Sequence, residues 1–488
     1  MSGPVRLVVT GGRVGGRAAE VHVRGELIAA VTFGPPQAGS RERRAQVVDV
    51  EGATLLPGLH DHHVHLRACV AAAGSVQAGP PAVEDAAGMA DALAAAPAGP
   101  GGWVRAVGYH QSVAGNLDRV SLDQLLASRP VRVQHRSGAL WVLNSSGLRA
   151  IGLLDLDYEN ADNELAGVGG IPAGVERDAA GHPTGRLWRL DGWLRERLPD
   201  PAPGGDAGLS ALSSAAATRG VTGWTDATPD RDDLEIEALI DAAARGVIGQ
   251  RLHLMAPLAT ALNADPAASG SIGPVKVLLD DDRLPAIDDL AASISAAHRK
   301  RRRVAVHCVT RVQAVVALAA FEEAGALDGD RIEHGAVLAA DQLAQLRRTG
   351  LTVVTQPGFV AARGDRYLLD VDRADRADLW RLGSLLTAGV RVAASSDAPL
   401  GPWDPWDGVE AATSRRSASG ALLGPTEAIG WKAAVGLWSG HAASPWKPRR
   451  VAAGQPSDLC AVMPAAGGGP PQVVMTVARG VVLHRAGS

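Results

Sequence analysis

Short apolar runs alternate with amphipathic stretches along most of the chain. The runs have the length of strands that are buried on both faces, and the stretches between them, such as 311–324 and 340–349, are long enough for crossover helices. Eight such units predict an α/β fold built around a (β/α)8 TIM-like barrel. The predicted barrel strands are Leu55–Leu59, Val221–Thr225, Arg251–Ala256, Val275–Leu279, Val304–Cys308, Arg331–His334, Thr352–Thr355 and Val390–Ala394.

The two ends of the chain do not fit the barrel pattern. Residues 1–54 form short β-rich segments with turn glycines, and residues 450–488 contain two further strand-like runs, 458–462 and 472–477. The simplest arrangement joins both ends in one small β-sandwich domain. The barrel then occupies residues 55–449.

A long segment separates the first two predicted barrel strands. A crossover helix needs far fewer residues than the stretch from about 70 to 215, and structureless loops of such length are uncommon. We therefore expect an inserted subdomain in this stretch, covering the mouth of the barrel.

Composition excludes several classes of protein. A formal charge of −4 and a hydrophobic fraction of 46% are typical of a globular chain rather than of a disordered or nucleic-acid-coating one. The basic run 299–303 follows an amphipathic stretch and is interpreted as a solvated helix end, with an anion or nucleic-acid patch as the less favoured alternative. The sequence shows neither a signal-peptide pattern nor a run of eighteen apolar residues, so we expect a cytoplasmic protein. Its three cysteines lie far apart in the sequence and are expected to stay reduced.

A cluster of imidazoles follows the first predicted barrel strand. Side chains alternate along an extended segment, so Asp61, His63 and His65 project to one side while His60 and His62 project to the other. Imidazoles at positions 63 and 65 make half of a metal site. Asp61 is expected to anchor the end of the strand rather than to bind metal.

Further candidate ligands end other predicted strands. His307, His334 and Asp397 follow the fifth, sixth and eighth strands, and these strand ends meet at one rim of a barrel. Lys276 lies inside the apolar fourth strand of a chain with four lysines against 44 arginines. Burial lowers the pKa of an amine, so Lys276 is either a neutral amine that reacts with carbon dioxide to form a bridging carbamate or a strand lysine that reaches solvent. The set suits zinc or a similar divalent ion.

The ordered pattern resembles the amidohydrolase superfamily. That family carries Asp-x-His-x-His on strand one, matched by residues 61–65, and lysine, histidine, histidine and aspartate on strands four, five, six and eight. The long insertion resembles the YtcJ-like subgroup, amidohydrolase family 3, as do the segments 331–334, 356–357, 396–399 and 456–459.

The resemblance implies a hydrolase with two metal ions, expected to be zinc. His63 and His65 would hold the more buried ion with Asp397, and His307 and His334 would hold the more exposed ion. Carboxylated Lys276 would bridge both. Asp397 would take the proton of a metal-bound hydroxide nucleophile and pass it to the leaving group.

We expect the substrate to be a small molecule with a carbon–nitrogen bond, such as an amide, N-acyl or formamide compound. Two alternatives stay open, a mononuclear metal-dependent deaminase and a non-catalytic binding protein on a decayed barrel. Neither a nucleic acid nor a membrane is expected as a partner, and a homodimer is left open.

Three residues are candidates for substrate binding from their positions alone. Gln356 ends the seventh strand, Trp403 follows Asp397 by six residues, and His110 lies in the insertion. Packing is the alternative role of each, and it is favoured for Trp403 and His110. Two motifs of the subgroup are altered near 108–111 and 137–139, so an altered substrate is expected.

Overall fold

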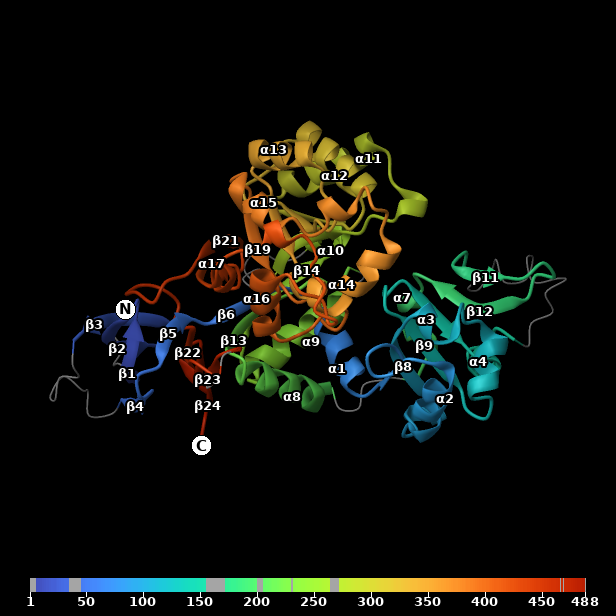
Figure 1. Cartoon of the computed structure of the whole chain (residues 1–488), viewed down its shortest axis with the longest axis horizontal. Helices are drawn as coiled ribbons and strands as arrows, with labels where there is room; N and C mark the ends of the chain where they lie inside the picture. The colour runs from blue at the N-terminus through green and yellow to red at the C-terminus, as the bar shows by residue number, and fades with distance from the viewer. Residues whose placement is uncertain are drawn as a thin grey trace. The chain divides into compact units, whose positions relative to one another are not determined.

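The computed structural model forms two compact units, which are described separately (Figure 1). The first unit joins Met1–Leu66 to Leu209–Ser488, and the second is Arg67–Gly208. The structure describes residues 6–34, 45–154, 172–199, 205–229, 231–263, 272–465, 467 and 469–487.

An eight-stranded parallel sheet forms the centre of the first unit. Its strand order is β19-β18-β17-β16-β15-β14-β13-β6, so sequence neighbours pair from β13 onward. The backbone amide of Asp397 donates to the carbonyl of His63 (2.8 Å), and that of His65 donates to the carbonyl of Ala398 (2.9 Å), which links the first strand to the last. The predicted barrel is confirmed. The strands are β6 (Leu59–Val64), β13 (Val221–Asp226), β14 (Arg251–Ala256), β15 (Ile272–Val277), β16 (Val304–Cys308), β17 (Arg331–His334), β18 (Thr352–Thr355) and β19 (Arg391–Ala394).

The first predicted barrel strand, Leu55–Leu59, is wrong. The apolar run divides at Gly58: β5 (Thr54–Pro57) belongs to the terminal sheet, and the barrel strand is the segment after it, β6. A Cβ atom at Gly58 would lie 2.2 Å from the side chain of Thr222, so only glycine fits where the chain crosses between the sheets. The apolar run alone does not tell which sheet each of its halves joins.

Helices alternate with the barrel strands, and their ends carry the expected signals. The side chain of Thr310 caps α12, and Gly325 follows its last residue. The basic run 299–303 begins at the last residue of α11, and its first two residues, Arg299 and Lys300, are exposed as expected for a solvated helix end. Within the described ranges, no helix is both long and apolar enough to cross a membrane. The principal helices are α8 (Gly205–Ala217), α9 (Asp233–Ala244), α10 (Leu258–Asn263), α11 (Ile287–Arg299), α12 (Arg311–Ala324), α13 (Ala340–Thr349), α14 (Gly358–Asp370), α15 (Leu382–Thr387), α16 (Pro405–Ser414) and α17 (Trp431–Gly436).

Both ends of the chain contribute strands to one eight-stranded sheet, which confirms the predicted joining of the two ends. Its order is β24-β23-β22-β5-β1-β2-β3, with β4 paired to β1. Alternate apolar residues, among them Val9, Val21, Leu55 and Met475, build its core. The strands are β1 (Leu7–Val14), β2 (Arg17–Arg24), β3 (Leu27–Phe33), β4 (Gln46–Asp49), β22 (Leu459–Met463), β23 (Gln472–Ala478) and β24 (Val481–Arg485). A short hairpin, β20 (Gly440–His441) and β21 (Ser444–Pro448), precedes β22.

The second unit has its own sheet and apolar cores. Six strands run in the order β11-β12-β10-β9-β8-β7, and one apolar core joins Val133 of β9 to Leu93 and Leu122 of the helices. The strands are β7 (Val76–Gln77), β8 (Val104–Tyr109), β9 (Val131–His135), β10 (Leu140–Leu143), β11 (Val175–Arg177) and β12 (Pro183–Trp188). Its helices are α2 (Ala86–Ala95), α3 (Gln111–Ala114), α4 (Arg119–Leu125), α5 (Ser145–Ala150) and α7 (Asp191–Arg197).

Candidate metal centre

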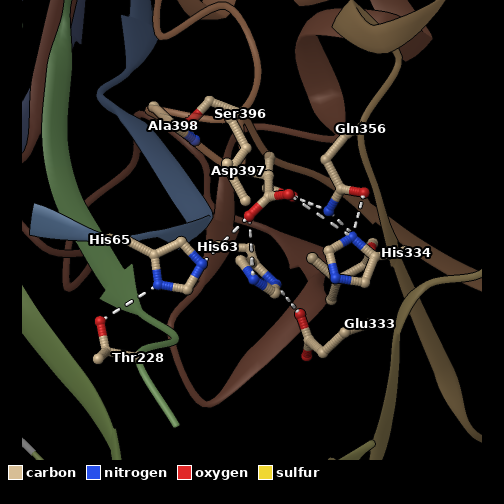
Figure 2. A network of polar contacts seen from close by, with 12 residues as sticks. His63, His65, Thr228, Glu333, His334, Gln356, Ser396, Asp397 and Ala398 are labelled. Atoms are coloured by element: carbon tan, nitrogen blue, oxygen red, sulfur yellow. Dashed lines mark hydrogen bonds and ion pairs between the residues drawn. The ribbon is translucent and has the colours of Figure 1, made fainter. Parts of the chain in front are cut away.

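Three predicted ligands converge at the C-terminal ends of β6 and β19 (Figure 2). One potential ligand atom from each of His63, His65 and Asp397 lies within 4.8 Å of the other two. Oδ1 of Asp397 is 3.4 Å from Nε2 of His63 and 3.2 Å from Nε2 of His65. These short distances bring two imidazoles and one carboxylate around a single point.

The second ring nitrogen of His63 is held by a buried carboxylate. His63 Nδ1 contacts Glu333 Oε2, and Arg331 contacts the same carboxylate through Nε and Nη2. All three side chains are at most 1% exposed. Burial opposes ionisation of Glu333, but Arg331 and His63 hold its pKa well below the usual range. An ionised carboxylate only accepts, so Nδ1 of His63 carries the proton and Nε2 presents a lone pair.

A partner of Nδ1 also fixes the tautomer of His65. Its Nδ1 lies 3.2 Å from Oγ1 of Thr228, and that hydroxyl donates to Oδ1 of Asp226 (2.8 Å). Because the hydroxyl proton is directed to Asp226, the oxygen of Thr228 accepts from Nδ1. The Nε2 atom of His65 therefore also presents a lone pair.

His334 is oriented by an amide. Its Nδ1 lies 2.9 Å from Oε1 of Gln356, while Nε2 of Gln356 donates to Oγ of Ser395 (2.9 Å) and to the carbonyl of Val354 (3.3 Å). A carbonyl cannot donate, so the amide orientation is fixed and Nδ1 of His334 carries the proton. Gln356, predicted as a substrate-binding residue, contacts a predicted ligand.

His307 and Lys276 complete the predicted set. The ring centroids of His307 and His334 are 4.5 Å apart, and those of His63 and His334 are 4.8 Å apart. Lys276 is 6% exposed, and its Nζ has no hydrogen-bond partner among the described residues. Burial lowers the pKa of Lys276, although the nearby carboxylates oppose the effect. The amine therefore loses its proton more readily than an exposed lysine does.

Burial also keeps the imidazoles of His63 and His307 neutral. It lowers the pKa of His63 to about 3 and the pKa of His307 well below its usual range. Neutral imidazole and ionised carboxylate are the forms that bind metal. Oδ1 of Asp397 has no hydrogen-bond partner among the described residues and faces Nε2 of His63 and of His65 at 3.4 and 3.2 Å. Because the partners of both Nδ1 atoms place the ring proton on Nδ1, two lone pairs and a carboxylate oxygen face one another. A divalent cation resolves this repulsion, so these residues fit a metal ion.

The neighbouring backbone is fixed by Asp61. Its carboxylate accepts from the amide of Ser396 (3.0 Å), the hydroxyl of Ser396 and the amide of His63 (3.2 Å). Burial raises the pKa of Asp61 to about 7. Asp61 thus connects the strand that carries His63 with the segment that carries Asp397, in the anchoring role expected from the sequence.

The two other imidazoles of the cluster lie elsewhere, as alternation predicts. The rings of His60 and His62 stack at 4.5 Å, and Nε2 of His60 lies 2.9 Å from Oγ1 of Thr225. Both are buried polar residues. They are structural members of the barrel core rather than part of the converging group.

The remaining substrate-binding candidates have local contacts. Trp403 is 36% exposed, and its ring lies 3.9 Å from the Arg219 guanidinium carbon. Arg219 also pairs with Asp404 (2.9 Å), so Trp403 takes part in packing on this side of the first unit. His110 caps α3 in the second unit by accepting from the amide of Ser112 (3.1 Å).

Sequence reasoning gave no role to Glu333 or Thr228. A signal for Glu333 was available, because a carboxylate inside an apolar strand next to a predicted ligand must find a buried partner. Thr228 gave no comparable signal, since it follows its strand in a loop and contacts His65 only in the folded chain.

The chain combines a TIM-like barrel with imidazoles and a carboxylate that converge at the C-terminal rim. This combination is typical of barrel enzymes that bind a metal ion at that rim. The family model described as "Amidohydrolase family" matches residues 46–484. The chain belongs to this amidohydrolase family, and it is accordingly a hydrolase.

Individual relatives agree with this assignment. N-substituted formamide deformylase from Arthrobacter pascens is 25% identical over 473 residues, covering 87% of this chain and 82% of the relative. The putative amidohydrolase YtcJ of Bacillus subtilis (strain 168) is 28% identical over 336 residues, 62% of this chain and 61% of the relative. Among solved structures, an uncharacterized metal-dependent hydrolase from Pyrococcus furiosus matches with a TM-score of 0.68 and 18% identity, covering 93% of this chain and 98% of that one. The last similarity concerns the fold alone.

Proposed function

We propose that this amidohydrolase cleaves a carbon–nitrogen bond of a small molecule with the help of two divalent metal ions, expected to be zinc. One observation carries the proposal: the unprotonated Nε2 atoms of His63 and His65 face an ionised oxygen of Asp397 at 3.2–3.4 Å. His307 and His334 would hold the second ion. Lys276, once carboxylated by carbon dioxide, would bridge the pair.

Bound ions would polarise the scissile carbonyl and acidify the attacking water. Asp397 would accept the proton of that water and deliver it to the leaving nitrogen, so that the amine leaves neutral. Glu333, Thr228 and Gln356 would keep the three imidazoles in the tautomer that leaves Nε2 free.

N-substituted formamides and other N-acyl amines are the substrates we propose to test first. The support is the 25% identity to N-substituted formamide deformylase over most of both chains. The altered motifs of the insertion argue for testing lactams and carbamates beside them.

All three cysteines are free and buried, which accords with the proposed cytoplasmic location.

Metal content and Lys276→Ala test the binuclear centre. Elemental analysis of the zinc-loaded protein is expected to give about two equivalents, and Lys276→Ala is expected to lower that number and to abolish the dependence of activity on bicarbonate. Lys432→Ala, which removes an exposed lysine, is the matched control. Unchanged stoichiometry and turnover in Lys276→Ala would exclude the bridging carbamate.

Asp397→Asn tests the proton transfer. Turnover is expected to fall by about 10²–10⁴-fold, the usual contribution of a positioned acid–base group. Full activity would remove Asp397 from the mechanism. One metal equivalent together with release of ammonia from an aminated ring would instead support the mononuclear deaminase.

A further inference from the structure

A cavity lies at the opposite end of the barrel from the candidate metal centre. Its wall includes His253 of β14, the start of β15, the segment before β16 and Arg331 at the start of β17. The turn of the β20–β21 hairpin adds Ala442 and Ala443. The cavity is open to solvent and has a volume of about 50 Å³. It lies at the N-terminal ends of the strands, where barrel enzymes do not place their catalytic groups.

Positive charge dominates the wall of this cavity. Arg301, Arg302, Arg303 and Arg331 line it, and the described lining residues include no aspartate or glutamate. Two carboxylates, Asp328 and Asp330, flank the lining residue Gly329 in sequence. Asp328 is paired with Arg391 at 2.7 Å, and Asp330 accepts from the amides of Val304 (2.8 Å) and Leu327 (2.7 Å). Four guanidinium groups around one small space attract an anion.

Arg331 supplies a donor without a partner. It is 1% exposed, and its Nε and Nη2 atoms are used by Glu333 and by the carbonyl of His62. Its Nη1 atom is buried and has no hydrogen-bond partner among the described residues. A buried charged donor without an acceptor is costly, and this donor belongs to a guanidinium group that lines the cavity, so an anion there would offset part of the cost.

Other groups on the wall suit the same ligand. Nε of Arg303 donates to the carbonyl of Asp328 (2.9 Å), which restrains this guanidinium beside the cavity. Burial and the charges of Arg331 and Arg303 lower the pKa of His253 to about 3, so its neutral ring can donate one hydrogen bond.

We propose that this cavity binds a small divalent oxyanion of the sulfate and phosphate type. Several guanidinium groups can share the oxygens of such an ion, and the modest volume favours the ion itself, or a small ester of it, over a large ligand. The proposal does not depend on the chemistry of the metal centre.

Sulfate is the first probe, because it tests the site without a substrate. Calorimetric titration of the full chain with sodium sulfate, at an ionic strength held constant with sodium chloride, is expected to show one saturable site. The double variant Arg301→Gln/Arg303→Gln is expected to weaken binding at least about tenfold, as the loss of charge-assisted hydrogen bonds implies. Arg299→Gln/Lys300→Gln is the matched control: it removes two exposed charges from the same segment that do not line the cavity.

The outcomes separate the proposal from general electrostatics. Equal weakening in both double variants, or no saturable binding by the wild type, would overturn it. Retained binding in Asp397→Asn is expected, and loss there would assign the sulfate to the metal centre and refute the cavity site. Glycerol 3-phosphate is the second probe, and it distinguishes two sources of the anion. If it binds about as tightly as sulfate, the natural ligand is a phosphate ester. If only sulfate and inorganic phosphate bind, the natural ligand is the free ion.

Discussion

Glu333 is expected to control metal affinity without binding metal, and Glu333→Gln tests this directly. The substitution keeps the shape of the side chain but removes the charge that faces Arg331 and the acceptor that fixes Nδ1 of His63. An amide can also present its NH2 group to His63, which would favour the wrong tautomer. Loss of a partner that orients a ligating imidazole costs about 10–100-fold in metal affinity.

The same change has a separate cost in stability. Arg331 and Glu333 are both at most 1% exposed, so the variant leaves a buried guanidinium without its counter-charge. Breaking a buried pair in this way costs about 3–5 kcal/mol. Replacing both residues by apolar ones, Arg331→Met/Glu333→Leu, is expected to recover much of that free energy of unfolding, but not the metal affinity, because His63 still lacks its acceptor.

Two measurements separate these effects. Urea unfolding of the metal-free protein gives the stability term, and competition with a chromophoric chelator gives the zinc affinity. Glu427→Gln is the matched control: Glu427 is 6% exposed and accepts from the amide and hydroxyl of Ser384, away from the imidazoles. Wild-type zinc affinity in folded Glu333→Gln, or an equal loss in Glu427→Gln, would refute the orienting role.

Two further predictions concern buried groups. Burial raises the pKa of Asp226, but Arg231, 2.7 Å away, outweighs this effect and lowers it. The ion pair therefore contributes to stability above the unfolded carboxyl pKa of about 3.9. This contribution is lost as the pH falls toward the lower pKa of the folded state. Asp226→Asn should destabilise the protein by about 3–5 kcal/mol at pH 7 in urea unfolding and flatten the acid limb of the stability profile, and an unchanged profile would contradict the pairing. Burial raises the pKa of the Cys460 thiol to about 12 and raises that of Cys308 further, so native protein should resist a thiol reagent that labels both after unfolding. Rapid native labelling at Cys308 or Cys460 would disprove this burial.

The barrel could be predicted because its signal is local and repeated. Each buried strand needs a short apolar run, and a helix must follow to return the chain, so seven of the eight runs lie on observed strands with small shifts at their ends. The exception, 55–59, spans the crossing from the terminal sheet to the barrel sheet. Pairing of β5 with β22, four hundred residues later in the chain, decides that boundary, and no local pattern contains it.

The convergence of His63, His65 and Asp397 could be predicted for a related reason, and the partners that orient the two imidazoles could not. Strand ends place His63, His65 and Asp397 at one rim whatever their neighbours are, because the topology of the barrel fixes their positions. The tautomer of each imidazole depends instead on the residue that contacts its Nδ1 atom in the folded chain. Those partners lie 270 residues away for His63 and 163 for His65.

Gln356 illustrates the difference between position and role. It lies 22 residues after His334, at the end of the next strand, so its place at the rim follows from the topology. A rim position suits substrate contact and ligand support equally well. Only the second set of contacts, from Nε2 to Ser395 and Val354, fixes its amide and commits Oε1 to His334. A residue whose donor and acceptor are both used inside the barrel has little left to offer a substrate, so Gln356→Ala should act on metal retention before it acts on substrate selectivity.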